Sequence, residues 1–78
     1  MFFQKKKRKI IGIDGMHCDH CASKVDQALE SLSDVDSVRV DLKKKIAIVY
    51  YSDDVDSLLL QKTVEDLGYV VTGIKEVH

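Results

Sequence analysis

The 78-residue sequence contains no proline, no tryptophan and no apolar run near the roughly 18–20 residues that a membrane-spanning helix needs. No apolar stretch follows the charged N-terminus, MFFQKKKRK, as it would in a secretory signal, so we expect a cytoplasmic protein. Serine–histidine–acid, phosphate-loop and dinucleotide motifs are absent, and we expect no enzymatic activity. Hydrophobic residues make up 45% and charged residues 32%, which is typical of one small globular domain covering residues 1–78.

The net charge of −1 is the sum of two unlike parts. The first ten residues contain five basic residues, from Lys5 to Lys9, and no acidic one. The rest of the chain contains the other seven basic residues and all 13 acidic ones. Such a run can attract nucleic acid, anionic lipid or an acidic protein face. Because aromatic residues do not interleave it, we interpret residues 1–8 as a solvated basic tail and expect no nucleic-acid partner. The sequence leaves open whether Phe2 and Phe3 join the core.

Hydrophobic periodicity predicts two helices and four strands. Apolar residues at helical spacing indicate the helices, and period-2 alternation or short β-branched runs indicate the strands. The elements expected along the chain are strand 9–15, helix 19–33, strand 36–42, strand 46–51, helix 55–68 and strand 69–77. This β-α-β-β-α-β order predicts a ferredoxin-like α+β sandwich, with a four-stranded antiparallel sheet and both helices on one face.

Local signals predict the ends and the buried faces of these elements. Asp19 and Asp56 are the expected N-caps, and Gly68 is the expected C′ glycine of the second helix. Val55 and Leu60 have the spacing of a hydrophobic staple. The shared faces are expected to hold Ala22, Val25, Leu29 and Leu32 on the first helix, Leu60, Val64 and Leu67 on the second, and Ile46, Ile48 and Tyr50 on strand 46–51.

The chain's only two cysteines, Cys18 and Cys21, form a C-x-x-C pair at the start of the first expected helix. Residues three apart at a helix start have Cβ atoms roughly 5–6 Å apart, so two sulfurs can hold one ion. The positive end of the helix favours the thiolate, the form that binds metal, and Gly15 permits an otherwise strained loop. In a reducing compartment such a pair is more typical of metal binding or redox chemistry than of a structural disulfide.

The residues around the pair favour one metal over another. A structural zinc site has four protein ligands, but the further candidates, His17, Asp19 and His20, lie within the same five residues and are too crowded to surround one ion. An open two-thiolate site favours Cu(I). Zn(II) is the alternative, with a histidine or a partner's ligand completing the shell. His17 is the candidate third ligand, and its imidazole would make affinity fall below about pH 6.5.

A C-x-x-C pair also serves thiol–disulfide exchange, so a thiol–disulfide oxidoreductase is the alternative of another class. The thioredoxin type has a longer α/β domain and a cis-proline beside the motif, and this chain has no proline. The absence of proline therefore favours metal binding over redox catalysis.

The stretch GMHCDHCASKVDQALESL resembles the heavy-metal-associated domain family, whose motif G-M-x-C-x-x-C falls on residues 15–21. The resemblance continues through V-x-V-x-L at 38–42, I-A-I-V-Y at 46–50 and EDLGY at 65–69, and covers about Ile10 to Val77. This family includes bacterial copper chaperones and the N-terminal domains of copper- and zinc-pumping ATPases. The motif combined with the β-α-β-β-α-β order is far more specific than C-x-x-C alone.

The resemblance implies a role for several residues. Cys18 and Cys21 would be the Cu(I) ligands, and Met16 would pack under the loop without binding metal. Tyr69 resembles the aromatic residue near the metal site of bacterial chaperones. His17 departs from the family pattern, in which Thr or Ser is more common before the first cysteine in copper members. Because of this departure, we expect Zn(II) binding slightly more than we would from the motif alone.

The function implied by the resemblance is that of a copper chaperone. The protein would pass Cu(I) by thiolate exchange to a metal-binding domain of a copper-transporting ATPase or to a copper-responsive regulator, and shared copper could bridge two copies into a homodimer. The alternatives are the N-terminal metal-binding domain of a P-type heavy-metal ATPase and a mercury-binding relative. The latter type is usually secreted, and no signal is seen here.

Overall fold

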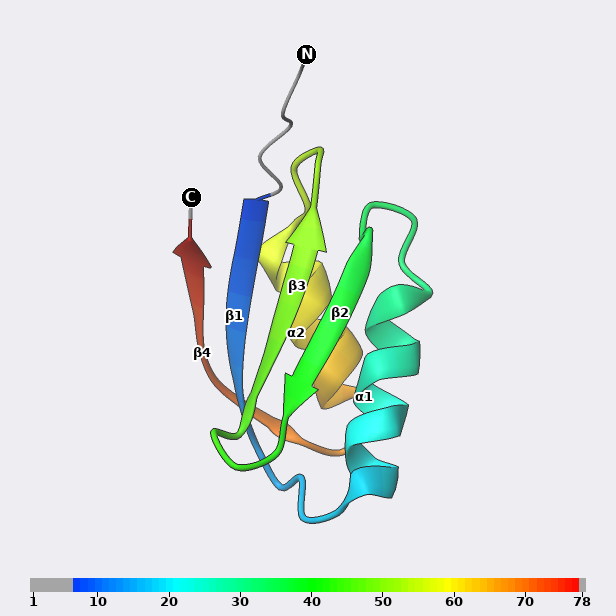
Figure 1. The fold of residues 1–78 in the computed structure, drawn as a ribbon, viewed down its shortest axis with the longest axis vertical. Helices are drawn as coiled ribbons and strands as arrows, with labels where there is room; N and C mark the ends of the chain where they lie inside the picture. Colours follow the sequence, from blue (N-terminus) through cyan, green and yellow to red (C-terminus); the bar gives the residue numbers. More distant parts are fainter. Residues whose placement is uncertain (1–6, 78) are drawn as a thin grey trace.

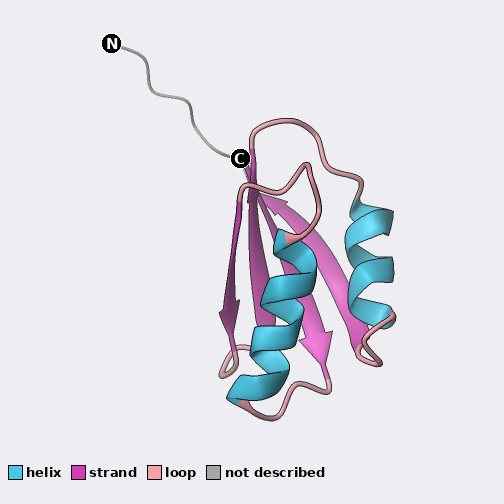
Figure 2. Ribbon diagram, turned by 90° about the vertical axis from the view of Figure 1, so that its right-hand side faces the viewer, coloured by secondary structure: helices cyan, strands magenta, loops and turns pink. Residues whose placement is uncertain are grey.

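The computed structural model describes residues 7–77, which form one sheet and two helices (Figure 1). In chain order the elements are β1 (Lys7–Asp14), α1 (Asp19–Glu30), β2 (Ser37–Asp41), β3 (Ile46–Tyr51), α2 (Ser57–Glu65) and β4 (Val70–Val77). All four strands pair antiparallel in the order β2-β3-β1-β4. Figure 2 shows both helices in front of the same face of this sheet. The predicted ferredoxin-like α+β sandwich is therefore confirmed.

The core lies between the helices and the inner face of the sheet. Alternate residues of β1 and β3 point into it, because successive strand residues face opposite sides. Ile46, Ile48 and Tyr50 share one face, as the alternation predicts, but they are only half buried on the face that the helices leave open. The fully buried side chains come from the two central strands and both helices: Ile11, Ile13, Val25, Leu29, Ala47, Val49, Tyr51, Leu60 and Val64.

Helix α1 begins differently from the prediction. Its N-cap is Cys18, which is extended with φ −151° and makes no side-chain capping hydrogen bond. Asp19, the predicted N-cap, is the first helical residue, where its carboxylate interacts favourably with the positive end of the helix. The helix ends at Glu30 rather than at residue 33, and the Ser31 hydroxyl donates to the Ala28 carbonyl at 2.6 Å.

Helix α2 begins as predicted and ends earlier than predicted. The Asp56 side chain caps it by accepting a hydrogen bond from the Leu58 amide at 2.9 Å, and the staple residues Val55 and Leu60 are both buried. The helix ends at Glu65 rather than at 68, so Leu67 leaves the buried stripe and is 36% exposed, contrary to the prediction. Gly68 has a φ of +96° in the turn that follows.

Strand β1 includes Lys7 and Arg8, which the sequence assigns to the tail; residues 1–6, with Phe2 and Phe3, lie outside the described residues. Lys9 is buried rather than solvated. Its ammonium donates to the Val55 carbonyl and to the Ser57 hydroxyl, each at 2.7 Å, and lies 5.5 Å from the centre of the Tyr51 ring. These bonds hold the start of β1 against the start of α2.

Neither helix within residues 7–77 combines the length and the apolar character that crossing a membrane requires.

Candidate metal centre

The loop between β1 and α1, residues 15–18, lies at one end of the molecule and carries Cys18, while Cys21 lies in the first turn of α1 (Figure 1). Gly15 has a φ of +106°, a value that side chains strongly disfavour, and it turns the chain out of β1. Met16 is only 3% exposed and packs in the core, as the resemblance implies. The loop is therefore anchored in the core two residues before the first cysteine.

The two cysteines lie side by side. The Cys18 thiol donates to the Cys21 sulfur across an Sγ–Sγ distance of 3.4 Å, with Cys18 exposed and Cys21 half buried. A disulfide bond measures about 2.05 Å, so the pair is reduced. Two sulfurs on opposite sides of one ion, each at about 2.3 Å, would lie about 4.6 Å apart. The sulfurs therefore need to separate by only about 1 Å to hold a metal between them.

Helix α1 presents its positive end to both sulfurs. Cys18 is the N-cap and Cys21 lies in the first turn, where the backbone N–H groups have no partner inside the helix. The pKa of Cys21 is lowered from its ordinary value of 9.0 to about 7, first by hydrogen bonding from Tyr69, then from Cys18 and from the backbone of His17. At neutral pH a large share of Cys21 is therefore thiolate, the form that binds soft metals.

Tyr69 comes from the loop between α2 and β4 and contacts both Cys21 and Gly15. Its own pKa is raised, chiefly because its hydroxyl donates a hydrogen bond to Cys21 and cannot do so when ionised. A Cβ placed on Gly15 would lie 3.1 Å from Tyr69 Cδ1. The tyrosine ring therefore packs against the glycine of the metal loop while its hydroxyl reaches the second cysteine.

The remaining candidate ligands do not complete a shell. His17, Asp19 and His20 are all exposed. Within residues 7–77, no group of three or more His, Cys, Asp or Glu side chains lies close enough to hold one ion. The described chain therefore offers two sulfurs and no preformed third ligand, and a role for His17 stays a prediction.

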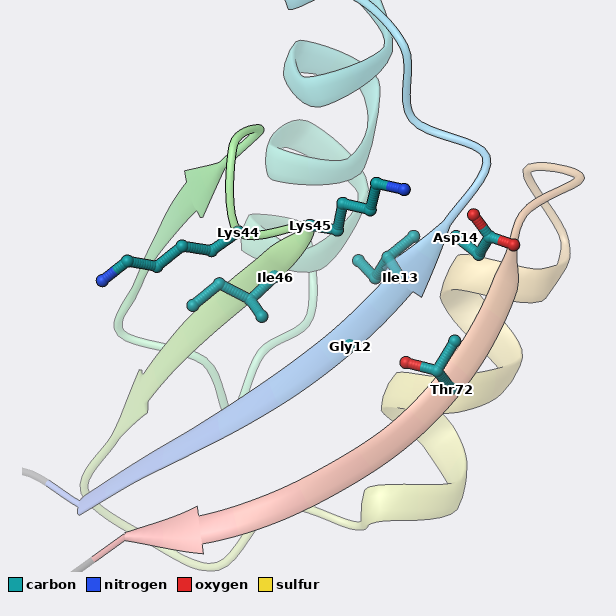
Figure 3. A pocket seen from close by; sticks show the side chains of 7 residues that line it. All are labelled: Gly12, Ile13, Asp14, Lys44, Lys45, Ile46 and Thr72. Atoms are coloured by element: carbon teal, nitrogen blue, oxygen red, sulfur yellow. The ribbon is translucent and has the colours of Figure 1, made fainter.

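A hollow on the open face of the sheet lies close to this end of the molecule (Figure 3). It is lined by Gly12, Ile13, Asp14, Lys44, Lys45, Ile46 and Thr72. Figure 3 shows the Lys44 and Lys45 side chains extending in different directions rather than converging on one point. Neither cysteine lines the hollow, so it is separate from the metal loop.

The sequence predicts the candidate site residues but does not show how they are held together. The motif identifies Cys18 and Cys21, and resemblance alone identifies Tyr69. The contact between Gly15 and Tyr69 has no local signal, because the two residues are far apart in the sequence and meet only when β4 pairs with β1. The N-cap position of Cys18 could likewise not be predicted, because the neighbouring Asp19 is a residue type that caps helices more often.

Comparison with known proteins identifies the class. The family model of the heavy-metal-associated domain matches residues 10–70. The chain belongs to this family.

Individual relatives come from two kinds of protein. The chain is 39% identical over 64 residues to the copper chaperone CopZ of Staphylococcus haemolyticus, covering 81% of this chain and 94% of that protein. A solved CopZ metallochaperone has a TM-score of 0.80 and 35% identity, covering 83% of this chain and 98% of the other. Copper-transporting ATPase 1 of Rattus norvegicus is 43% identical over 54 residues, which are 68% of this chain and 4% of the ATPase.

Proposed function

We propose that this protein is a copper chaperone that binds one Cu(I) ion between Cys18 and Cys21 and transfers it to a partner. The observation that carries the proposal is the pair of unbonded sulfurs 3.4 Å apart at a helix N-terminus, of which Cys18 is exposed and Cys21 half buried. Two thiolates with no preformed third ligand suit soft Cu(I) better than zinc, which takes four ligands in structural sites. The similarity to CopZ proteins along most of their length supports the same function.

Transfer proceeds by exchange of thiolate ligands and needs no catalysed covalent step. A thiolate of the partner attacks the bound ion, three sulfurs share it briefly, and one sulfur of this chain then leaves. Cys18 is the more exposed sulfur and meets the partner first. Cys21, held by Tyr69, keeps the ion until the partner's second ligand replaces it. The protein thus acts as a carrier in the cytoplasm and not as an enzyme.

The partner is proposed to be a metal-binding domain of a copper-transporting ATPase or a copper-responsive regulator. The rat ATPase contains a segment similar to this chain, so donor and acceptor would offer comparable sites. That same similarity favours a second candidate function, in which this chain is itself the N-terminal domain of a P-type heavy-metal ATPase. Copper binding would be common to both, and only the length of the natural polypeptide distinguishes them.

The first experiment is an anaerobic competition titration of the reduced protein. Cu(I) is presented with a chromophoric chelator, and Zn(II) separately with its own indicator. We expect tight binding of one Cu(I) per chain and much weaker binding of zinc. Cys18→Ser with Cys21→Ser should abolish Cu(I) binding, whereas His20→Ala, which changes an exposed neighbour, should leave it intact.

Two outcomes would contradict the proposal. If zinc bound as tightly as Cu(I), and His17→Ala weakened zinc selectively, the site would be a zinc site with His17 as third ligand. If the double serine variant still delivered copper to an acceptor domain, the sulfurs would not be the carrier groups.

A copper-bridged homodimer follows from the same open geometry. An ion held by the exposed Cys18 and the half-buried Cys21 can accept a third and fourth sulfur from a second copy. We expect dimer formation on addition of Cu(I), measured by analytical ultracentrifugation, and its loss when a strong competing thiol is added. A dimer that persists in the metal-free protein would have another cause.

A further inference from the structure

The face of the sheet that the helices leave open has an apolar centre bordered by cations. Figure 1 shows α2 behind the sheet, so this open face is turned toward the viewer. In the half of the face nearer the start of β1, the strand register brings together three apolar or aromatic side chains and three basic ones. We call these six residues the open-face patch: Arg8, Ile10, Arg39, Ile48, Tyr50 and Lys75.

The register places two of the cations on either side of the apolar centre. Ile10 and Ile48 pair on the central strands and are half buried. Arg39 of β2 pairs with Ile48, and Lys75 of β4 pairs with Ile10. Because neighbouring strands lie about 4.8 Å apart, the backbones of Arg39 and Lys75 are about 14 Å apart across the sheet.

One end of the patch holds the third cation beside an aromatic residue. Arg8 pairs with Tyr50 in the register of β1 and β3. A hollow lined by Ser37, Val38, Arg39 and Tyr50 lies at this end. The patch is therefore indented here rather than flat.

The charges of the patch are all of one sign and are available to a partner. The three basic side chains are exposed, and among residues 7–77 none of them forms a salt bridge or a side-chain hydrogen bond. Glu76, next to Lys75, lies on the other face, where it accepts a hydrogen bond from the Tyr51 hydroxyl at 3.3 Å. Asp41, on the open face of β2, lies beyond the patch toward the metal loop.

An amphipathic helix with acidic flanks fits such a patch. The backbone groups within a sheet are already paired, so an extended segment laid on its face finds no hydrogen-bond partners there, whereas a helix satisfies its own backbone groups. A helix with its side chains is about 10–12 Å across, which fits between cations about 14 Å apart. Carboxylates on both sides of its apolar stripe would then meet Arg39 and Lys75.

The same observations disfavour nucleic acid and membrane as occupants. The patch has one aromatic ring on which a base could stack, and the net charge of the chain is −1, whereas nucleic-acid-binding domains are strongly basic. Binding at a membrane surface buries apolar side chains about 5–10 Å deep. Ile10 and Ile48 are half buried within the sheet surface, between longer basic side chains.

We propose that the open-face patch binds an acidic amphipathic helix of a protein partner. The helix lies along β1 and β3, with its apolar stripe on Ile10, Ile48 and Tyr50 and its carboxylates paired with the three cations. It adds a third layer to the molecule. Because the metal loop follows the other end of β1, the bound helix leaves Cys18 accessible. The inference is independent of the proposed function and is tested on the metal-free protein.

The probe is a synthetic peptide of about 15 residues, with leucine along one helical stripe and glutamate on both flanks. Methyl NMR of the reduced full-length chain measures its binding. We expect the Ile10 and Ile48 signals to shift to saturation, while those of the fully buried Ile11 and Ile13 stay nearly constant. A scrambled peptide of the same composition, which has no stripe, should not bind. Equal binding of both peptides, or no binding up to about 1 mM, would overturn the proposal.

The charge contribution has a matched control. Arg39→Gln with Lys75→Gln should weaken peptide binding about three- to tenfold, because two exposed ion pairs are lost. Lys24→Gln with Lys62→Gln removes the same charge from the exposed sides of α1 and α2 and should leave the affinity unchanged. Circular dichroism checks that each variant keeps the fold. Equal weakening by the two pairs of substitutions would show that only the net charge matters, which overturns pairing at the patch.

Three other occupants are tested on the same Ile10 and Ile48 signals. Tighter binding of oligothymidylate than of the peptide would assign the patch to single-stranded nucleic acid. Shifts caused by vesicles of phosphatidylglycerol and phosphatidylcholine would assign it to an anionic membrane. Signals that depend on protein concentration without peptide would assign it to a second copy of this chain. Each of these results overturns the proposal, and peptide binding without any of them supports it.

Discussion

The Tyr69 hydroxyl and the Cys21 sulfur adjust each other's protonation. The hydrogen bond from Tyr69 is the largest cause of the lowered pKa of Cys21, and it raises the pKa of Tyr69 in return. Because the folded-state pKa of Cys21 lies below its ordinary value, its thiolate stabilises the fold fully above about pH 9. This stabilisation is lost as the pH falls through about 7.

Tyr69→Phe should raise the pKa of Cys21 from about 7 toward 9.0, because it removes the largest stabilising bond of the thiolate. At pH 7 about half of the wild-type Cys21 is ionised. In the variant we expect several-fold slower alkylation of this thiol at that pH. The measurement is the pH dependence of alkylation, with each cysteine followed by mass spectrometry. Tyr50→Phe, on the open face of the sheet, is the matched control and should leave the profile unchanged.

Gly15→Ala should destabilise the protein by about 1–3 kcal/mol, because a side chain at a φ of +106° is strained and its Cβ presses on the Tyr69 ring. Urea unfolding of the reduced protein measures the change as a lower midpoint at constant slope. Gly73→Ala is the control, since a Cβ there meets nothing within 4 Å and its φ is not positive. Equal midpoints for the two variants would contradict this account.

At the scale of the elements, the two helices begin in different ways. The start of α2 is fixed by hydrogen bonding and packing between residues close together in the chain. Asp56 caps α2 through its own neighbour, the Leu58 amide, and the buried staple of Val55 and Leu60 fixes the same register. At α1, Met16 is buried in the core two residues before the N-cap Cys18, and Asp19 is the first helical residue.

The difference between local patterns and contacts made far along the chain explains which parts of the fold could be predicted from the sequence. Period-2 and period-3.6 patterns specify all six elements, because each depends on residues close together in the chain. The burial of Lys9 could not be predicted, since the Val55 carbonyl and the Ser57 hydroxyl that satisfy its ammonium lie 46 and 48 residues away. In sequence it is one of five adjacent cations, and only the fold separates it from them.

Asp56→Ala should cost about 1 kcal/mol of stability, because α2 loses the acceptor for its Leu58 amide. Thermal or urea unfolding measures the loss. Asp53→Ala removes an exposed carboxylate of the same loop that caps nothing, and it is the matched control. If both variants lost the same stability, the effect would come from charge and not from capping.

At the scale of the whole molecule, the start of β1 and the end of β4 lie at one end, and the metal loop lies at the other. Arg8 near the start of β1 pairs with Val77 at the end of β4, while the other end of β1 leads into the loop with Cys18 (Figure 1). The start of β1 and the end of β4 therefore lie at the end of the molecule away from the sulfurs.

A fluorescent protein joined after His78 should change the affinity for Cu(I) by less than about twofold, an energy difference of about 0.4 kcal/mol or less. The anaerobic chelator competition described above measures it. The matched control is the same fluorescent protein inserted between Asp14 and Gly15, which should abolish tight binding because it disrupts the loop. A large loss of affinity from the C-terminal fusion would contradict the separation of the two ends.

The 3.4 Å distance between the two sulfurs is compatible with two competing reactions, disulfide formation and metal binding. An external two-electron oxidant that removes two electrons and two protons would join the sulfurs in a disulfide of about 2.05 Å, whereas opening by about 1 Å admits an ion. Both processes consume the same thiolates, so a chain that has formed the disulfide cannot bind an ion at this pair. If the pair holds Cu(I) as proposed, oxidation would therefore lower the copper-binding capacity of the protein, and copies that already hold an ion would be protected from oxidation.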